Sequence, residues 1–340
     1  MKPPKAAGRK PAKTNLPALV TPTAIERIQP KQSNSLNGWV RLYCTLEAGA
    51  NAPSTFLAKV RDLRLFLTFL QEKLGSDHPD QWTKSVTAGF LRHLENTLGR
   101  KPTTVNRVLA TLRHCANWIH HHRAFLASNP ADGIKDLVVD EPEWKGLSDL
   151  EVMRLKSAAE QLVRLKAAPN QHPVRDQAIF LVLLNTGLRV SELAALDRRQ
   201  HEGKHLTDVK RKGKVRTAKV FLPTEAREAL DRYLELRGGN PGPLLCSRSG
   251  QRLERQHVDR LVKQIAAQAN AHLRHDQRIQ LSAHILRHTF LRKVAEKRGV
   301  HVAMEVAGHT SSKYIWRYVK PSEAEKEKAL EGLFWLVCFG

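Results

Sequence analysis

Apolar residues recur at helical spacing through the segment from about 34 to 127, and no part of it alternates as a β-strand would. They return every three or four residues from Phe56 to Leu70 and from Val105 to Ile119. Shorter runs, Leu36 to Leu46 and Val86 to Leu98, predict two further helices. Each such helix has one apolar face to bury, so the pattern predicts a small helical bundle.

The second half of the chain mixes helical and strand signals. Ser148 followed by Glu151 is a capping box, which predicts that a helix, and with it a second domain, begins near residue 147. Short β-like runs flank a basic turn and predict a hairpin or small sheet. The predicted fold class is mostly α with a small β-sheet: an N-terminal helical bundle and an α+β domain. The predicted strands are Leu206 to Val209 and Thr217 to Leu222, and the predicted helices are Ser191 to Leu196, Glu225 to Arg237, His257 to Ala269, His284 to Lys297 and Val302 to Ala307.

These signals divide the chain into five segments. The first is rich in lysine, arginine and proline and has no acid, which predicts a disordered basic arm. The last contains the apolar run Leu333 to Phe339, which must pack either on its own domain or on a neighbouring protomer. The predicted segments are the arm 1–20, the helical domain 21–130, a linker 131–146, the second domain 147–325 and the apolar tail 326–340.

The charge of the chain points to a polyanionic partner. Lysine and arginine number 56 against 33 aspartate and glutamate, a net charge of +23. Cationic side chains displace the counterions condensed on nucleic acid, so DNA or RNA is the expected partner. A basic face of the fourth predicted helix, with Arg107, Arg113 and Arg123, could lie against it.

The same composition argues against a membrane or a metal. No run of about 18 apolar residues exists to span a bilayer, and the N-terminus lacks the apolar region of a secretory signal. A cytoplasmic, nucleoid-associated protein is therefore expected. Four widely separated cysteines suggest neither a zinc site nor a disulfide framework. The segment His201 to His205 matches H-E-x-x-H literally, but Gly203 and the following hairpin disfavour the helix that zinc binding needs.

The segment from Leu281 to Tyr318 brings together residues that can act on a phosphate. His284 and Arg287 lie three residues apart on one predicted helix, so both can reach the same point. An arginine fork binds two phosphate oxygens and keeps its charge. Tyr318 is a candidate nucleophile, because cations lower the cost of ionising a phenol whose pKa is near 10. Tyr314 is a possible rival.

Five motifs in order resemble the tyrosine recombinase (phage integrase) family. The likeness covers roughly residues 34 to 325, including a helical core-binding domain followed by the catalytic domain. The motifs are Thr186-Gly187-Leu188-Arg189-Val190-Ser191-Glu192-Leu193, the basic hairpin turn, His284-Ile285-Leu286-Arg287-His288-Thr289-Phe290, Gly308-His309 and Tyr318.

The resemblance implies a role for each matching residue. Arg189 and Arg287 would clamp the scissile phosphate. His309 would hydrogen-bond the same phosphate, and His284 would assist deprotonation of Tyr318. Lys212 would protonate the departing 5′ oxygen, and its neighbours Lys210 and Lys214 would contact the backbone at most. The implied catalytic set is Arg189, Lys212, His284, Arg287, His309 and the nucleophile Tyr318, with Glu192 in support.

The implied reaction is site-specific DNA recombination. Tyr318 would form a 3′-phosphotyrosyl link that stores the energy of the broken bond, so no cofactor, neither ATP nor metal, is required. The implied partners are double-stranded DNA bearing specific sites, with a monomer or dimer on each site and a homo-tetramer in the full complex. An accessory protein is a further candidate partner. Strand exchange would pass through a Holliday junction. The alternatives are a DNA-relaxing or hairpin-forming enzyme with the same chemistry and a non-cutting DNA-binding regulator.

Overall fold

The computed structural model describes residues 34–123, 125–140, 146–165, 172–211, 216–308 and 323–331. The chain forms two compact units, Met1–Glu141 and Pro142–Gly340. Among the described residues, no helix has the length and apolar character needed to cross a membrane. The predicted basic arm and the run Leu333 to Phe339 lie outside the described residues.

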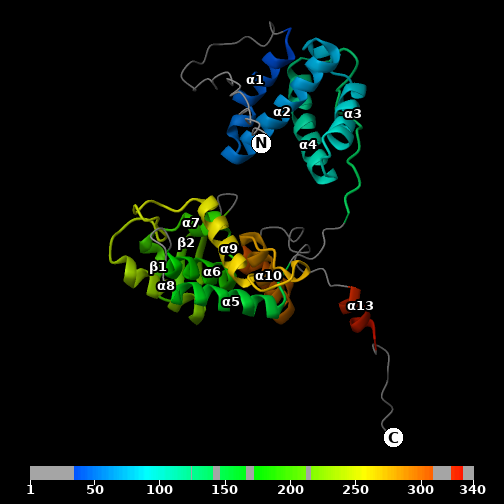
Figure 1. Cartoon of the computed structure of the whole chain (residues 1–340). Helices are drawn as coiled ribbons and strands as arrows, with labels where there is room; N and C mark the ends of the chain where they lie inside the picture. Colours follow the sequence, from blue (N-terminus) through cyan, green and yellow to red (C-terminus); the bar gives the residue numbers. More distant parts are fainter. Residues whose placement is uncertain are drawn as a thin grey trace, which may run out of the picture. The chain divides into compact units, whose positions relative to one another are not determined.

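The first unit is a bundle of helices, as the apolar spacing predicted (Figure 1). The first helix has the predicted bounds. The two longest helices of the unit begin at Pro53 and Pro102, because the fixed φ of proline suits a first helical turn. The third helix continues into a π-helical turn, His93–Thr97. The helices are α1 (Leu36–Leu46), α2 (Pro53–Leu74), α3 (Lys84–Arg92) and α4 (Pro102–His122).

Aromatic side chains fill the centre of this bundle. Phe66 packs against Trp82 and Phe90, with ring centroids 4.8 and 5.2 Å apart. The indole of Trp82 donates a 2.8 Å hydrogen bond to the Thr87 hydroxyl, which donates in turn to the carbonyl of Pro130 at 2.8 Å. These bonds draw the chain that follows α4 back onto the bundle.

The first residues of the predicted linker pack against this unit. Ala131 is buried in its core, and Ile134 and Leu137 lie against it. The Asn106 side chain donates to the carbonyl of Leu137 at 2.9 Å and accepts from its N–H at 2.8 Å. The extended segment to residue 137 is therefore part of the helical unit.

Three arginines of the predicted basic face of α4 form ion pairs. Arg107 forms a two-pronged ion pair with buried Asp62, at 2.5 and 2.9 Å, and Thr111 donates to the same carboxylate at 3.0 Å. Arg113 pairs with Asp136, and Arg123 pairs with Asp80. Each of these carboxylates lies at least 23 residues away in the chain, so the sequence alone did not reveal the pairs, and contact of this face with DNA stays a prediction.

The second unit packs helices around a central one (Figure 1). The run Gln177 to Leu184 is buried throughout and lies in α6, against which α5, α8 and α10 pack. The capping box of Ser148 and Glu151 opens α5, as predicted. The helices are α5 (Asp149–Arg164), α6 (Pro173–Thr186), α7 (Val190–Ala194), α8 (Thr224–Arg237), α9 (Arg255–Ala269), α10 (Ala283–Arg298), α11 (Val300–Ala307) and α13 (Glu323–Leu330).

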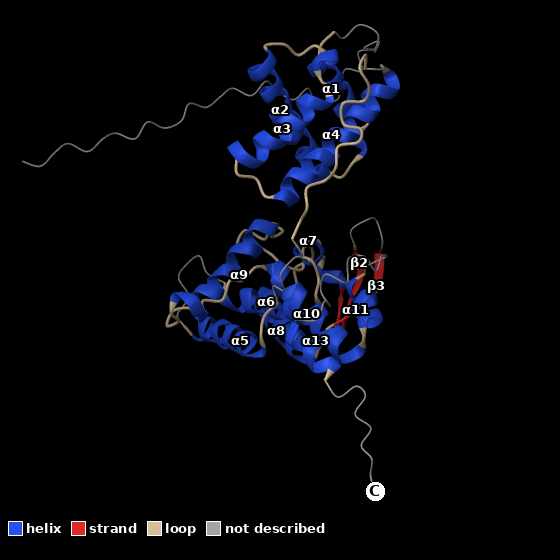
Figure 2. Cartoon of the chain, turned by 90° about the vertical axis from the view of Figure 1, so that its right-hand side faces the viewer, coloured by secondary structure: helices blue, strands red, loops and turns tan. Residues whose placement is uncertain are grey.

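A small antiparallel sheet lies at the edge of this unit, with α11 beside it (Figure 2). Its strands are β1 (His201–Glu202), β2 (His205–Lys210) and β3 (Arg216–Phe221), in that order. Leu206 pairs with Val220, and both are buried. The H-E-x-x-H segment thus forms two paired strands joined by a turn at Gly203, so its histidines do not share a helix face.

Asp62 should contribute strongly to the stability of the helical unit. Asp62→Ala removes the buried carboxylate at the centre of this network and takes from buried Thr111 its carboxylate acceptor, whereas half-exposed Arg107 can turn to water, so we expect the free energy of unfolding to fall by about 1–3 kcal/mol. Asp136→Ala removes a solvent-exposed pair and should cost below about 1 kcal/mol. Urea unfolding followed by the fluorescence of Trp39, Trp82 and Trp118 measures both. Equal losses in the two variants would contradict a structural role for the buried network.

Candidate active site

A left-handed glycine turn after α6 sets the position of the first motif. Gly187 has φ of 61°, a conformation that costs an ordinary residue about 1–2 kcal/mol. A Cβ there would lie 2.4 Å from Cδ1 of Phe290 on α10. Only glycine lets the turn lie this close to α10. The turn leads directly to Arg189, which precedes α7.

Glu192 holds Arg189 in place. Its Oε1 accepts from Nη1 of Arg189 at 2.7 Å, and its Oε2 accepts from the Arg189 backbone N–H at 2.9 Å. Burial alone would raise the pKa of Glu192, but these hydrogen bonds and the charges of Arg189 and Arg211 outweigh it and lower that pKa. Glu192 is therefore ionised at neutral pH, while the Arg189 side chain stays 29% exposed. An anion can reach an arginine that is already oriented.

Arg211 is a second buried partner of Glu192 that the sequence analysis missed. Its Nη1 donates to Oε2 of Glu192 at 2.8 Å, its Nε donates to Oγ1 of Thr217 at 2.9 Å, and its Nη2 donates to the Val306 carbonyl at 3.3 Å. The side chain is 1% exposed. The sequence prediction for the basic turn concerned its lysines alone, because nothing in the composition of that turn distinguishes a buried arginine from an exposed one.

Arg287 joins the ends of two helices. It lies on α10, whose N-terminus is capped by Ser282, and its residue is 2% exposed. Nη1 donates to the carbonyl of Gly187, and Nη2 donates to that of Ala307 at 2.9 Å. The turn that bears Arg189 and the end of α11 are thereby fixed to the same guanidinium.

His284 lies at the N-terminal end of α10, on its exposed side. Its ring stands edge-on to that of His288, with centroids 4.2 Å apart. Loss of water on one side, and then the charges of Arg287 and Arg189, lower the pKa of His284. Burial and the neighbouring His284 lower the pKa of His288 to about 4. Both imidazoles are therefore neutral at pH 7.

The structure gathers three of the six predicted catalytic residues. Arg189, His284 and Arg287 come together around the Gly187 turn, close enough for the two arginines to act on the pKa of His284. Lys212, His309 and Tyr318, like the rival Tyr314, lie outside the described residues. Within the described ranges, no cluster of histidine, cysteine or carboxylate side chains is suited to hold a metal ion.

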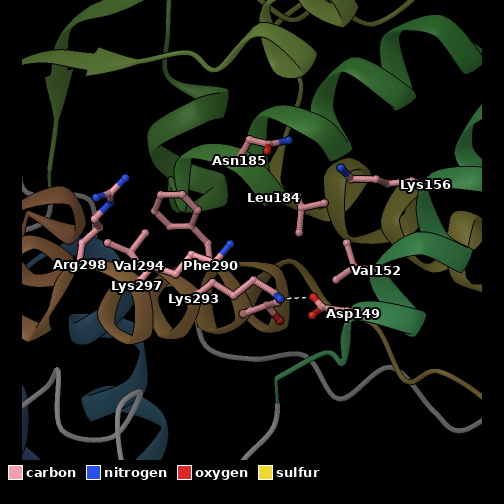
Figure 3. A pocket seen from close by; sticks show the side chains of 11 residues that line it. Asp149, Val152, Lys156, Leu184, Asn185, Phe290, Lys293, Val294, Lys297 and Arg298 are labelled. Carbon is pink, nitrogen blue, oxygen red and sulfur yellow. Dashed lines mark hydrogen bonds and ion pairs between the residues drawn. The ribbon is translucent and has the colours of Figure 1, made fainter.

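A separate hollow of about 340 Å³ lies between α5, α6 and α10 (Figure 3). Val152, Leu184 and Phe290 form apolar parts of its wall, and Lys293, ion-paired to Asp149, stands at its rim. None of the described catalytic candidates lines it. Phe290 is shared, however, since its ring also supports the Gly187 turn.

Comparison with known proteins finds relatives that match most of the chain. The model of the phage integrase family matches residues 156–325, and that of the phage integrase N-terminal SAM-like domain matches 43–122. Tyrosine recombinase XerC of Pelobacter propionicus is 28% identical over 279 residues, which cover 80% of this chain and 86% of that protein. Tyrosine recombinase XerD of Listeria monocytogenes is 26% identical over 82% of this chain and 91% of its own length.

Solved structures share the fold at lower sequence identity. The Tn1549 transposon integrase in complex with transposon right end DNA has a TM-score of 0.68 at 17% identity, covering 87% of this chain and 98% of that one. A lambda integrase tetramer bound to a Holliday junction has a TM-score of 0.65 at 17% identity, covering 84% and 80%. With both domain models matched in order along the sequence, the chain belongs to the phage integrase family, the family of the tyrosine recombinases.

Proposed function

We propose that this chain, a site-specific tyrosine recombinase, cleaves and rejoins double-stranded DNA through a 3′-phosphotyrosyl intermediate formed by Tyr318. The observation that carries the proposal is the group around the Gly187 turn, where Arg189, Arg287 and a neutral His284 converge. A phosphodiester needs positive donors that are in place before charge develops. Binding alone would not require a neutral base among those donors.

The arginines would stabilise the pentacoordinate phosphorus. Arg189, oriented by Glu192 and partly exposed, is the donor that an incoming phosphate meets first. Arg287, which is buried, would add its positive charge, and His309 would donate a hydrogen bond to the phosphate. Attack by the Tyr318 oxygen breaks the bond to the 5′ oxygen and conserves its energy in the new phosphotyrosine bond, so religation needs no ATP.

Two proton transfers complete the proposed step. His284 would take the phenolic proton of Tyr318, directly or through water, because it is neutral at working pH. Lys212, which follows β2, would donate a proton to the 5′ oxygen as it departs. We assign the nucleophile to Tyr318 rather than Tyr314 because it lies nine residues after His309, a spacing that resembles the family's.

We further propose that the protein acts as a tetramer on two DNA sites, with strand exchange through a Holliday junction. The lambda integrase structure with this fold is a tetramer on such a junction, and the Tn1549 integrase holds DNA. The net charge of +23 suits a DNA partner. The segments up to Glu141 would contact DNA, and those from Pro142 would cut it.

Substitution of the nucleophile gives the direct test. With nicked suicide DNA carrying sites from around the native gene, the wild type should form a covalent protein–DNA adduct that gel electrophoresis detects. Tyr318→Phe should abolish the adduct because it removes the attacking oxygen, while the matched variant Tyr314→Phe should retain it. Tight binding without an adduct in the wild type would favour a non-cutting regulator, and relaxation of supercoiled DNA without exchange would favour the relaxing enzyme.

The pH dependence of cleavage should reflect the lowered pKa of His284. A base with a lowered pKa takes up its proton only at more acidic pH, so cleavage should persist below pH 6.5 and fall as pH drops through that lowered pKa. Arg255→Gln removes one of the charges that lower it, which should raise the pKa and move the acid limb upward. NMR titration of the His284 ring and single-turnover cleavage should move together. A pKa of His284 that moves while the acid limb of cleavage stays in place would exclude His284 as the base.

A further inference from the structure

Arg211 lies where three elements of the second unit meet. It directly follows β2, and its guanidinium donates to Glu192 on α7, to Thr217 on β3 and to the Val306 carbonyl on α11. A Cβ on Gly308 would lie 3.0 Å from its Nε. One buried side chain therefore spans the first arginine motif, both strands of the hairpin and the end of α11.

Each of these elements bears or leads to a residue of the proposed reaction. Glu192 also binds Arg189, so the two arginines share one carboxylate. Lys212 is the next residue in the chain after Arg211, and His309 is the next after Gly308. The residue held by these three hydrogen bonds therefore directly precedes the proposed proton donor in the chain.

Fold stability alone is a poor explanation for this arrangement. Moving an arginine out of water is unfavourable, and a buried ion pair is often no more stabilising than apolar side chains of similar volume. Glu192 already has a partner in Arg189. Arg211 instead fixes the positions of α7, β3 and α11 relative to one another, because its planar fork binds an acceptor in each of them.

We propose that Arg211 is a positioning residue for the cleavage step, setting the β2–β3 turn so that Lys212 can deliver its proton to the departing 5′ oxygen. The inference rests on the proposed function, and in particular on the assignment of Lys212 as proton donor. A displacement of about 1 Å in a reacting group can cost about 100-fold in rate. Arg211→Met should accordingly slow single-turnover cleavage about 10- to 100-fold while leaving DNA affinity within about threefold.

A substrate with sulfur in place of the 5′ bridging oxygen separates positioning from a general loss of structure. In that substrate the Tyr318 oxygen bonds to phosphorus, the P–S bond breaks, and sulfur leaves as a thiolate without needing a proton, because thiols ionise near pH 8.5. A variant impaired only in proton delivery should recover most of its rate. We expect this recovery for Arg211→Met, and for Lys212→Ala as the benchmark.

The outcomes distinguish a failure of the proposed function from a failure of the positioning role of Arg211. If the wild type forms no adduct, or if sulfur fails to restore Lys212→Ala, the proposed function or its proton donor is wrong, and this inference falls with it. If sulfur restores Lys212→Ala but Arg211→Met stays equally slow on both substrates, or is unimpaired on both, the proton donor stands and the positioning role of Arg211 is wrong.

Further variants guard against misfolding and against a simple charge effect. Arg211→Lys keeps the charge but cannot span all three acceptors, so it should stay slow on the oxygen substrate; full activity would show that charge alone suffices. Thr217→Val removes only the β3 acceptor and should give a smaller defect of the same kind. Arg175 is a matched control, because it binds a carboxylate and the Cys246 carbonyl elsewhere in the unit. Arg175→Met should lower stability without changing the ratio of the two rates.

Discussion

Arginine contacts with the C-terminal ends of helices hold the candidate active site together. α6 ends at Gly187 and α11 at Gly308, both left-handed, with φ of 61° and 62°. Arg287 bridges the two ends through the carbonyls of Gly187 and Ala307. The last carbonyls of a helix lack partners within it and carry the negative end of its dipole, so a buried guanidinium there is well compensated. The loop that bears Arg189 cannot shift without disturbing this bridge.

Glu192 is what allows several cations to stay close together before a phosphate arrives. Its carboxylate takes Arg189 on one oxygen and Arg211 on the other, and those contacts lower its pKa enough to keep it charged despite burial. One negative charge among three arginines still leaves the cluster positive, as a phosphate site requires. The donors are thus arranged by the folded protein, and little reorganisation remains for the reaction.

Much of this could be predicted from the sequence, because local signals were strong. Helix spacing gave the bundle, and the capping box located the start of α5. Arg211 could not be predicted, because Asp208 adopts a φ of 50° within β2. Strict alternation from buried Leu206 would bury residues 208 and 210, yet Val209 and Arg211 are the buried ones. The ion pairs of α4 were missed for another reason, namely that their carboxylates come from distant segments.

The arginines that would bind the phosphate also affect the protonation state of a base placed beside them. Partial loss of water, and then the positive neighbours, lower the pKa of His284, so its imidazole stays neutral where a solvated histidine would begin to charge. His288, edge-on at 4.2 Å and with a pKa of about 4, adds no competing charge of its own. In the proposed reaction this environment would make His284 a weaker base, but one that is already in the protonation state a base needs. The arginines that lower its pKa would also help Tyr318 to ionise, so a modest base would be enough for that proton.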